Sequence, residues 1–360
     1  MSNGIIIMHE GRITGIIEKD AFSESEILTY AVGGKMKKIL KSYNREMSVF
    51  VALIVMTIIF GIINPIFIGS DNITDIINQA TIYGMMALGM TFVIISGGID
   101  LSVGSAFALI GVVISKMAVA GVHPIVVVIA GLLLGFMLGA INGGIISKMK
   151  LQPFIATMGT MAIFRGVAYV ISKGMPILKV PKEYRDMVDG LVFGNIRVSI
   201  FLFILLAIFF GILLSKTKFG NYVYAIGGNE ESARLSGVKV DVYKILIYGV
   251  GMMGTALAVI VQIGKLGTGE ASAAQGYELN AIAAVAIGGA SMAGGRGGII
   301  GTVLGAVLFS GLRVGLIVSG VETFYQYIAT GLVIIIAAYI EIVQTRLSDK
   351  KEIKTIKRRK

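Results

Sequence analysis

The chain has 360 residues, of which 55% are hydrophobic and only 15% are charged, and its mean hydropathy is +0.85. Soluble domains carry roughly 25% charged residues, so this composition excludes a soluble enzyme, a nucleic-acid-binding domain and a secreted domain held by disulfides. The net charge of +11 does not indicate nucleic acid, because the Lys and Arg residues flank apolar segments. With no Cys and only two, widely separated His residues, the sequence offers no ligand set for a metal ion.

The two ends of the chain are basic where they meet the apolar region. Residues 35–46 form a basic juxtamembrane segment before the first apolar run, and residues 346–360 form a basic tail after the last one. The first 34 residues contain no apolar stretch typical of a cleavable signal peptide. Basic clusters beside membrane spans are typical of cytoplasmic anchors, so we expect both termini to be cytoplasmic.

Ten apolar segments lie between these ends. A helix needs about 20 mostly apolar residues to cross a bilayer. The sequence therefore predicts an all-α, polytopic transmembrane helical bundle of about ten spans in one domain over residues 47–345. The expected spans are 47–65, 73–96, 102–120, 124–147, 153–172, 198–215, 244–263, 278–294, 298–319 and 323–344.

The connections between these spans give a check on the topology. If the N-terminus is cytoplasmic, the even-numbered connections are cytoplasmic too, and the longest of them, 216–243, is rich in Lys and Arg, as cytoplasmic loops are. The outer connection 173–197 departs from this rule. It carries five basic residues: Lys173, Lys179, Lys182, Arg185 and Arg197.

Glycine is frequent, with 48 residues, and it recurs every four positions in two stripes. Small residues at this spacing let membrane helices approach closely. Close packing of helices is therefore a sufficient explanation for these stripes. Their members are Gly131, Gly135 and Gly139 in one and Gly297, Gly301 and Gly305 in the other.

Two glycine-rich turns, 96–105 and 293–302, are either a weak internal repeat or two similar bends between spans. Ionisable groups are costly inside a membrane. Asp100 therefore has two possible roles. It is either structural, as a cap or a partner of Arg296, or it takes a direct part in transport. Ser102 is placed to cap the next helix. The candidate residues for the translocation path or helix break are Gly97, Gly98, Asp100, Ser102, Ser105, Glu278 and Arg296.

The centre of the 216–243 connection predicts a short capped helix. Asn229 suits the N-cap, Glu230 can pair with Arg234 four residues later, and Gly237 suits the position after the helix. Such a short helix is marginal alone in water, so it either docks on a partner or is a solvated connector. The candidate docking residues are Gly228, Asn229, Glu230, Glu231, Ala233, Arg234, Ser236 and Gly237.

The sequence contains no motor of its own. No Gly-x-x-x-x-Gly-Lys-[Ser/Thr] phosphate-binding loop occurs, and no serine, zinc or paired-carboxylate catalytic set is visible. Carboxylates are almost absent from the spans, which argues against a carrier driven by an ion gradient and favours a motor on another chain. Aromatic residues are few, and no cluster of them marks a sugar site.

Four motifs together carry a resemblance to a known family. The chain resembles the permease subunits of bacterial monosaccharide ABC importers of the ribose type, from about residue 46 to residue 345. The motifs are SGGIDLSVGS at 96–105, FIATMGT at 154–160, YAIGGNEESARLSGVKV at 224–240 and GYELNAIAAVAIGGASMAGGRGGIIGT at 276–302.

This resemblance implies a multi-pass protein of the bacterial inner (cytoplasmic) membrane without catalytic residues, metal or bound cofactor. It implies four kinds of contact: a second permease copy, an ATP-binding subunit that holds Mg-ATP, an extracytoplasmic sugar-binding protein and the lipid bilayer. The loop resembling 227–238 would dock on the ATP-binding subunit. Two alternatives remain: a permease of the same fold for a nucleoside, a sugar-like signal or an amino acid, and a facilitator without a motor.

Residues 1–34 depart from this family and resemble instead the C-terminal tail of the partner ATPase, without any nucleotide-binding motif. We interpret them as a fusion remnant or as sequence ahead of the true start, with a tether to the ATPase as a further alternative. As a remnant they would be dispensable and poorly ordered without their parent domain.

Overall fold

The computed structural model describes residues 4–9, 12–18, 46–192, 196–322, 324–333, 335–336 and 339. The basic segment before Glu46, the basic tail 346–360 and most of 1–34 lie outside the described residues. Within 1–34, strand β1 (Gly4–His9) pairs with β2 (Arg12–Glu18) in an antiparallel hairpin. The sequence analysis did not predict this hairpin, and the origin assigned to the segment stays a prediction.

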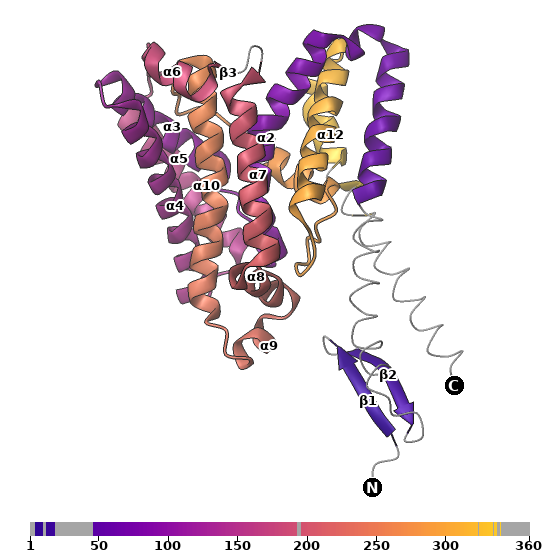
Figure 1. The fold of residues 1–360 in the computed structure, drawn as a ribbon. Helices are drawn as coiled ribbons and strands as arrows, with labels where there is room; N and C mark the ends of the chain where they lie inside the picture. The colour runs from indigo at the N-terminus through magenta and orange to yellow at the C-terminus, as the bar shows by residue number, and fades with distance from the viewer. Residues whose placement is uncertain are drawn as a thin grey trace.

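From Glu46 onward the chain is almost entirely helical, and every expected span contains a helix (Figure 1). The first helix covers Glu46–Ile63, and a last one includes residues 324–333. Between them lie η2 (Pro65–Ile68), α2 (Ser70–Ile95), α3 (Val103–Val119), α4 (Pro124–Lys148), α5 (Pro153–Ser172), α6 (Lys182–Asp189), β3 (Leu191–Val192), β4 (Ile196–Arg197), α7 (Val198–Lys216), α8 (Lys218–Gly228), α9 (Glu230–Leu235), α10 (Val240–Leu266), α11 (Tyr277–Ile287) and α12 (Ile299–Val318).

Seven of the described helices are long and apolar enough to cross a membrane: Glu46–Ile63, α2, α4, α5, α7, α10 and α12. The chain is thus a polytopic, all-helical membrane protein. Two expected spans are shorter, namely α3 with 17 residues and α11 with 11. The predicted span 278–294 is wrong in its second half, because α11 ends at Ile287 before two glycines. At 1.5 Å per residue it covers about 16 Å, roughly half of the hydrocarbon layer.

Helices α2 and α10 form the centre of the bundle. In their most apolar windows, 78% of the residues of α2 and 67% of those of α10 are buried, against 17% for Glu46–Ile63 and 22% for α7. Glycine makes the close packing possible, as predicted. A Cβ atom at Gly135 of α4 would lie only 2.6 Å from the Cβ of Ala256 of α10, and one at Gly139 would overlap the backbone of Tyr248. Larger residues there would push α4 away from α10.

The bundle has two distinct ends. Helices α8 and α9 lie at one end and α6 with β3 at the other, which we call the α9 end and the α6 end (Figure 1). Tyr184 and Val188 anchor α6, because both side chains are buried and the Tyr184 hydroxyl donates a 2.9 Å hydrogen bond to the Ile260 carbonyl. The two ends carry the candidate sites described next.

Candidate functional site

Helix α9 is the capped helix that the sequence predicted. The Asn229 side chain accepts a 2.8 Å hydrogen bond from the Ser232 N–H, and Gly237 has the left-handed backbone (φ 85°) expected after a helix end. The Arg234 guanidinium lies 3.6 Å from the Glu230 carboxylate, so this pairing is also confirmed. Each cap is set by a single residue at the end of the helix, Asn229 through its side chain and Gly237 through its left-handed backbone.

Two further ion pairs brace α9 against the start of α10. Arg234 contacts Asp241 at 2.9 Å, and Lys244 contacts Glu230 at 2.7 Å. Helix α9 is therefore joined to the start of α10 by two ion pairs. The sequence analysis did not identify Asp241 or Lys244, although both lie within fifteen residues of Glu230.

The outward side of α9 is largely polar but carries one apolar side chain. Among the candidate docking residues Ala233 faces the protein and is buried, and the others are exposed: Gly228, Asn229, Glu230, Glu231, Arg234, Ser236 and Gly237. Leu235, which the sequence analysis missed, is 81% exposed. A single exposed leucine does not by itself mark a partner surface, but Leu235 lies among the candidate docking residues.

Helix α8 leads directly into α9 and contacts both glycine-rich turns through backbone atoms. We call Gly97, Gly227, Gly294 and Gly295 the glycine joint. A Cβ atom at Gly294 would lie 2.7 Å from the Gly227 carbonyl oxygen and 2.9 Å from the Cα of Gly97. The Gly295 N–H donates a 2.8 Å hydrogen bond to the Ile95 carbonyl at the end of α2. The two turns that look alike in sequence are thus in contact with each other and with α8.

Asp100 lies in the first of these turns, 2% exposed, inside a hydrogen-bonded network. Its carboxylate accepts hydrogen bonds from the Ser102 N–H at 2.9 Å, the Ser102 hydroxyl at 2.6 Å and the Asn142 amide at 3.1 Å. Asn142 comes from α4, so the network ties the helix break to a second span. Gly98, two residues before Asp100, packs against the Tyr248 hydroxyl.

The suggested pairing of Asp100 with Arg296 is wrong. Arg296 is exposed, and the partners of the Asp100 carboxylate are Ser102 and Asn142. Ser102 occupies the N-cap position of α3 as predicted, but the predicted cap bond from its side chain is not formed. Ser102 precedes α3 but its hydroxyl makes no cap bond to that helix, because it donates to the stronger acceptor, the Asp100 carboxylate.

The remaining candidates for the translocation path lie around the start of α11. Glu278 is 8% exposed and packs against Gly104, where a Cβ would overlap its carboxylate. Ser105 is buried and its hydroxyl has no hydrogen-bond partner. Arg165 of α5 donates to the carbonyls of Ala271 and Ala273, at 2.5 and 2.7 Å, just before α11. Polar groups of α5 and α11 therefore lie close to Gly104 of α3.

Aromatic rings from separate parts of the chain gather in the same region. The ring centroids of Tyr83 and Tyr277 are 5.1 Å apart. The Phe309 ring lies 6.1 Å from Tyr83, and the Phe107 ring lies 5.9 Å from Tyr277. Arg313 donates a hydrogen bond to the Tyr83 hydroxyl and lies 5.3 Å from the centre of its ring. The four rings come from α2, α3, α11 and α12, far apart in sequence.

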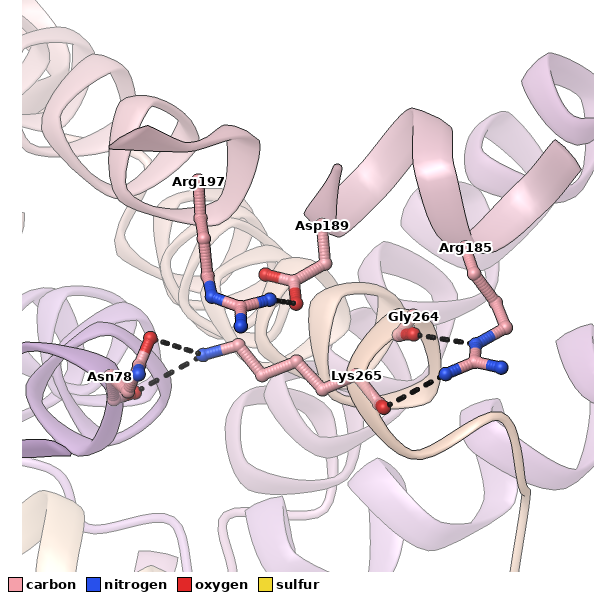
Figure 2. A network of polar contacts seen from close by, with 6 residues as sticks. All are labelled: Asn78, Arg185, Asp189, Arg197, Gly264 and Lys265. Atoms are coloured by element: carbon pink, nitrogen blue, oxygen red, sulfur yellow. Dashed lines mark hydrogen bonds and ion pairs between the residues drawn. The ribbon is translucent and has the colours of Figure 1, made fainter. Parts of the chain in front are cut away.

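A basic cavity of about 270 Å³ opens at the α6 end. Figure 2 shows most of its polar contacts: Arg197 pairs with Asp189 at 2.8 Å, and Arg185 donates to the Gly264 carbonyl at 3.1 Å. Lys265 reaches the Asn78 side chain at 3.3 Å. The cavity is lined by Lys182, Arg185, Asp186, Asp189, Arg197, Gly264 and Lys265.

Comparisons with known proteins identify the family. The family model described as "Branched-chain amino acid transport system / permease component" matches residues 72–338. The ribose import permease protein RbsC of Bacillus subtilis (strain 168) is 42% identical over 298 residues, 82% of this chain and 92% of that protein. Its namesake from Escherichia coli (strain K12) is 37% identical over 87% of this chain and 98% of that protein.

A third relative, the D-allose transport system permease protein AlsC of Escherichia coli (strain K12), is 36% identical over 81% of this chain and 90% of that protein. No solved structure matches the chain. The family model begins after residue 71, so it does not bear on the resemblance of residues 1–34 to an ATPase tail. The resemblance of the rest is confirmed: the chain belongs to the family of multi-pass permease components of bacterial ABC importers, which have no ATPase activity of their own.

Proposed function

We propose that the chain forms the translocation path of an ATP-driven importer for ribose or a closely related monosaccharide. The observation that carries the proposal is the 42% identity to a ribose import permease over 92% of that protein. Identity is lower, 36% and 32%, to permeases named for allose and for galactose or methyl galactoside. This order favours ribose over the other sugars.

The proposed topology has ten spans in the inner membrane and both termini in the cytoplasm. The α9 end is then cytoplasmic, as the Lys and Arg residues of 216–243 favour, and the α6 end faces outward. A second copy of the chain completes the path, and an extracytoplasmic binding protein delivers the sugar to the α6 end.

Helix α9 is the proposed contact with the ATP-binding subunit, which carries Mg-ATP. The exposed Leu235 and the charged residues around it supply a surface for docking. Movement of α9 would be passed to α10 by the Arg234–Asp241 and Lys244–Glu230 ion pairs and to both helix breaks by the glycine joint. The bundle would thereby switch between inward-open and outward-open states.

Uptake into proteoliposomes tests this function. The chain is reconstituted with its ATP-binding subunit and binding protein, and uptake of labelled ribose, allose and galactose is compared with and without ATP. We expect ATP-dependent ribose uptake that exceeds uptake of the other two sugars. Equal flux without ATP would contradict the motor and support a facilitator, and ATP-dependent uptake of none of these sugars would contradict the substrate.

The double variant Glu230→Ala/Arg234→Ala is expected to reduce ATP-dependent uptake at least about tenfold, since truncating charged groups at a docked interface costs 2–5 kcal/mol. The matched control is Asp241→Ala/Lys244→Ala, which removes the same braces from α10. If both double variants lose uptake equally, the brace alone explains the effect and docking through the α9 charges is contradicted. Co-purification of the ATP-binding subunit gives an independent measure of docking.

A further inference from the structure

The connection between α10 and α11 is held by an arginine through backbone carbonyls. Arg165 of α5 donates to the carbonyls of Ala271 and Ala273 at 2.5 and 2.7 Å. Within the described parts of the chain Arg165 forms no ion pair. Hydrogen bonds from a charged donor are stronger than those between neutral groups, so this side chain is a clamp on an irregular segment. We call residues 270–276 the latch segment.

The latch segment has a fixed point before it and a glycine at its end. Gly269, directly ahead of it, exchanges two backbone hydrogen bonds with Ile177, at 2.8 and 2.9 Å. Gly276 ends it with a left-handed backbone (φ 78°), directly before α11. A glycine at such a position can change its backbone angles at little steric cost. The latch segment can therefore turn at Gly276 while Gly269 stays in place.

Few apolar contacts hold the latch segment against the bundle. Its buried side chains are those of Ala271 and Ala274. Its exposed side chains are polar, namely Glu270, Ser272 and Gln275. Alanine side chains remove little apolar area from water, and elements with few buried apolar contacts open more readily than the core. The hydrogen bonds from Arg165 are thus a large share of what keeps the segment in place.

The backbone of the latch segment is strained at Ala274. Its φ is 57°, in the left-handed region that a residue other than glycine adopts at a steric cost. Its carbonyl packs against α3, where a Cβ atom at Gly104 would lie 2.6 Å from the Ala274 oxygen. Strained residues of this kind persist only where the surrounding contacts fix them. Releasing the clamp of Arg165 would therefore let Ala274 relax and move away from α3.

The latch segment leads directly into the polar and aromatic groups at the start of α11. Tyr277 and Glu278 follow it in sequence, and Glu278 packs against the same Gly104 of α3. We infer that the latch segment is a gate at the α6 end of the translocation path and that Arg165 is the positioning residue that holds it closed. The inference rests on the proposed function, because it needs a path that runs past the start of α11.

Cysteine labelling tests this gate, because the chain has no Cys of its own. Ala271→Cys places a thiol at a buried position of the latch segment, and the control Ala168→Cys makes the same substitution at a buried position of α5. The full importer in nanodiscs is treated with a water-soluble maleimide, at rest and during ATP hydrolysis with binding protein and ribose. Ala271→Cys should react about tenfold faster during turnover, as a gating segment does, and Ala168→Cys should react slowly in both states.

Two further substitutions should change the labelling of Ala271→Cys at rest in opposite directions. Arg165→Met removes both hydrogen bonds to the latch segment and should speed labelling about tenfold, corresponding to 1.4 kcal/mol. Ala274→Gly removes the backbone strain and should slow labelling about threefold. Hydrogen exchange of the 270–276 amides in the same two variants without Cys measures opening independently.

Equal labelling of Ala271→Cys at rest and during turnover would overturn the inference. So would an Arg165→Met protein in which Ala271→Cys and Ala168→Cys both react faster to the same extent, because that result assigns Arg165 to the stability of the whole bundle. A wild-type importer that shows no ATP-driven sugar uptake in proteoliposomes would contradict the proposed function instead.

Discussion

Replacing Gly227 with Ala is expected to abolish ATP-driven uptake and to destabilise the chain by about 3 kcal/mol, the upper part of the usual range for overpacking. A Cβ atom at this position would overlap the Ile95 carbonyl oxygen and lie 2.7 Å from the Gly295 nitrogen. Both neighbours are backbone atoms of the helix breaks, so they cannot move aside as a flexible side chain would. The glycine joint would have to open.

Gly228→Ala is the matched control, since this glycine is the next residue and a Cβ there would meet nothing within 4 Å. It should leave stability unchanged or slightly raised, because Ala favours a helix over Gly by roughly 0.5–1 kcal/mol. Stability is the readout that compares the two variants, since Gly228 also belongs to the candidate docking residues. The measurements are the denaturation midpoint in mixed micelles and uptake in proteoliposomes. Similar behaviour of the two variants would mean that α8 is not in close contact with the breaks.

Asp100→Ala is expected to destabilise the chain by about 3 kcal/mol, because it leaves the buried Ser102 N–H and hydroxyl donors without their acceptor at 1–3 kcal/mol each. The turn after α2 would lose its link to α4 and with it the defined geometry of the helix break. Denaturation in mixed micelles and the yield of folded protein measure this effect.

The isosteric variant Asp100→Asn separates structure from transport. Its oxygen can still accept from Ser102. After the Asn142 amide turns over, the Asn142 oxygen, which has no partner in the wild type, can accept from the new amide. We expect a loss of less than about 1 kcal/mol and near-normal uptake. A stable Asp100→Asn protein that no longer transports would show that the negative charge itself takes part in transport, the alternative that the sequence left open.

The features predicted well are those that depend on nearby residues. The caps of α9 follow from Asn229 and Gly237, and the approach of α4 to α10 follows from the glycine stripe of α4. Apolar segments of sufficient length predict helices regardless of what surrounds them. Each of these signals lies within a few turns of the helix it specifies.

The features predicted poorly depend on depth and on distant neighbours. Asp100 and Arg296 suggest a pair by charge, but charge alone does not reveal that one is buried and the other exposed. The true partner, Asn142, had a signal: it is a lone amide between the glycines of an apolar span. The ring cluster of Tyr83, Tyr277 and Phe309 had none, because its members are too far apart in the chain for any local pattern to connect them.

The half-length helix α11 has a consequence for hydration. The turn that follows it satisfies its backbone largely within itself, for example through the Ser291 N–H to the Arg296 carbonyl at 2.9 Å and the Gly294 N–H to the Ser291 carbonyl at 3.0 Å. Non-helical backbone at membrane depth is tolerated only when protein or water surrounds it. Any displacement that breaks these bonds must therefore admit water at the same moment. The Ser291 and Gly294 amides should accordingly exchange with deuterated solvent faster during turnover than in the resting protein.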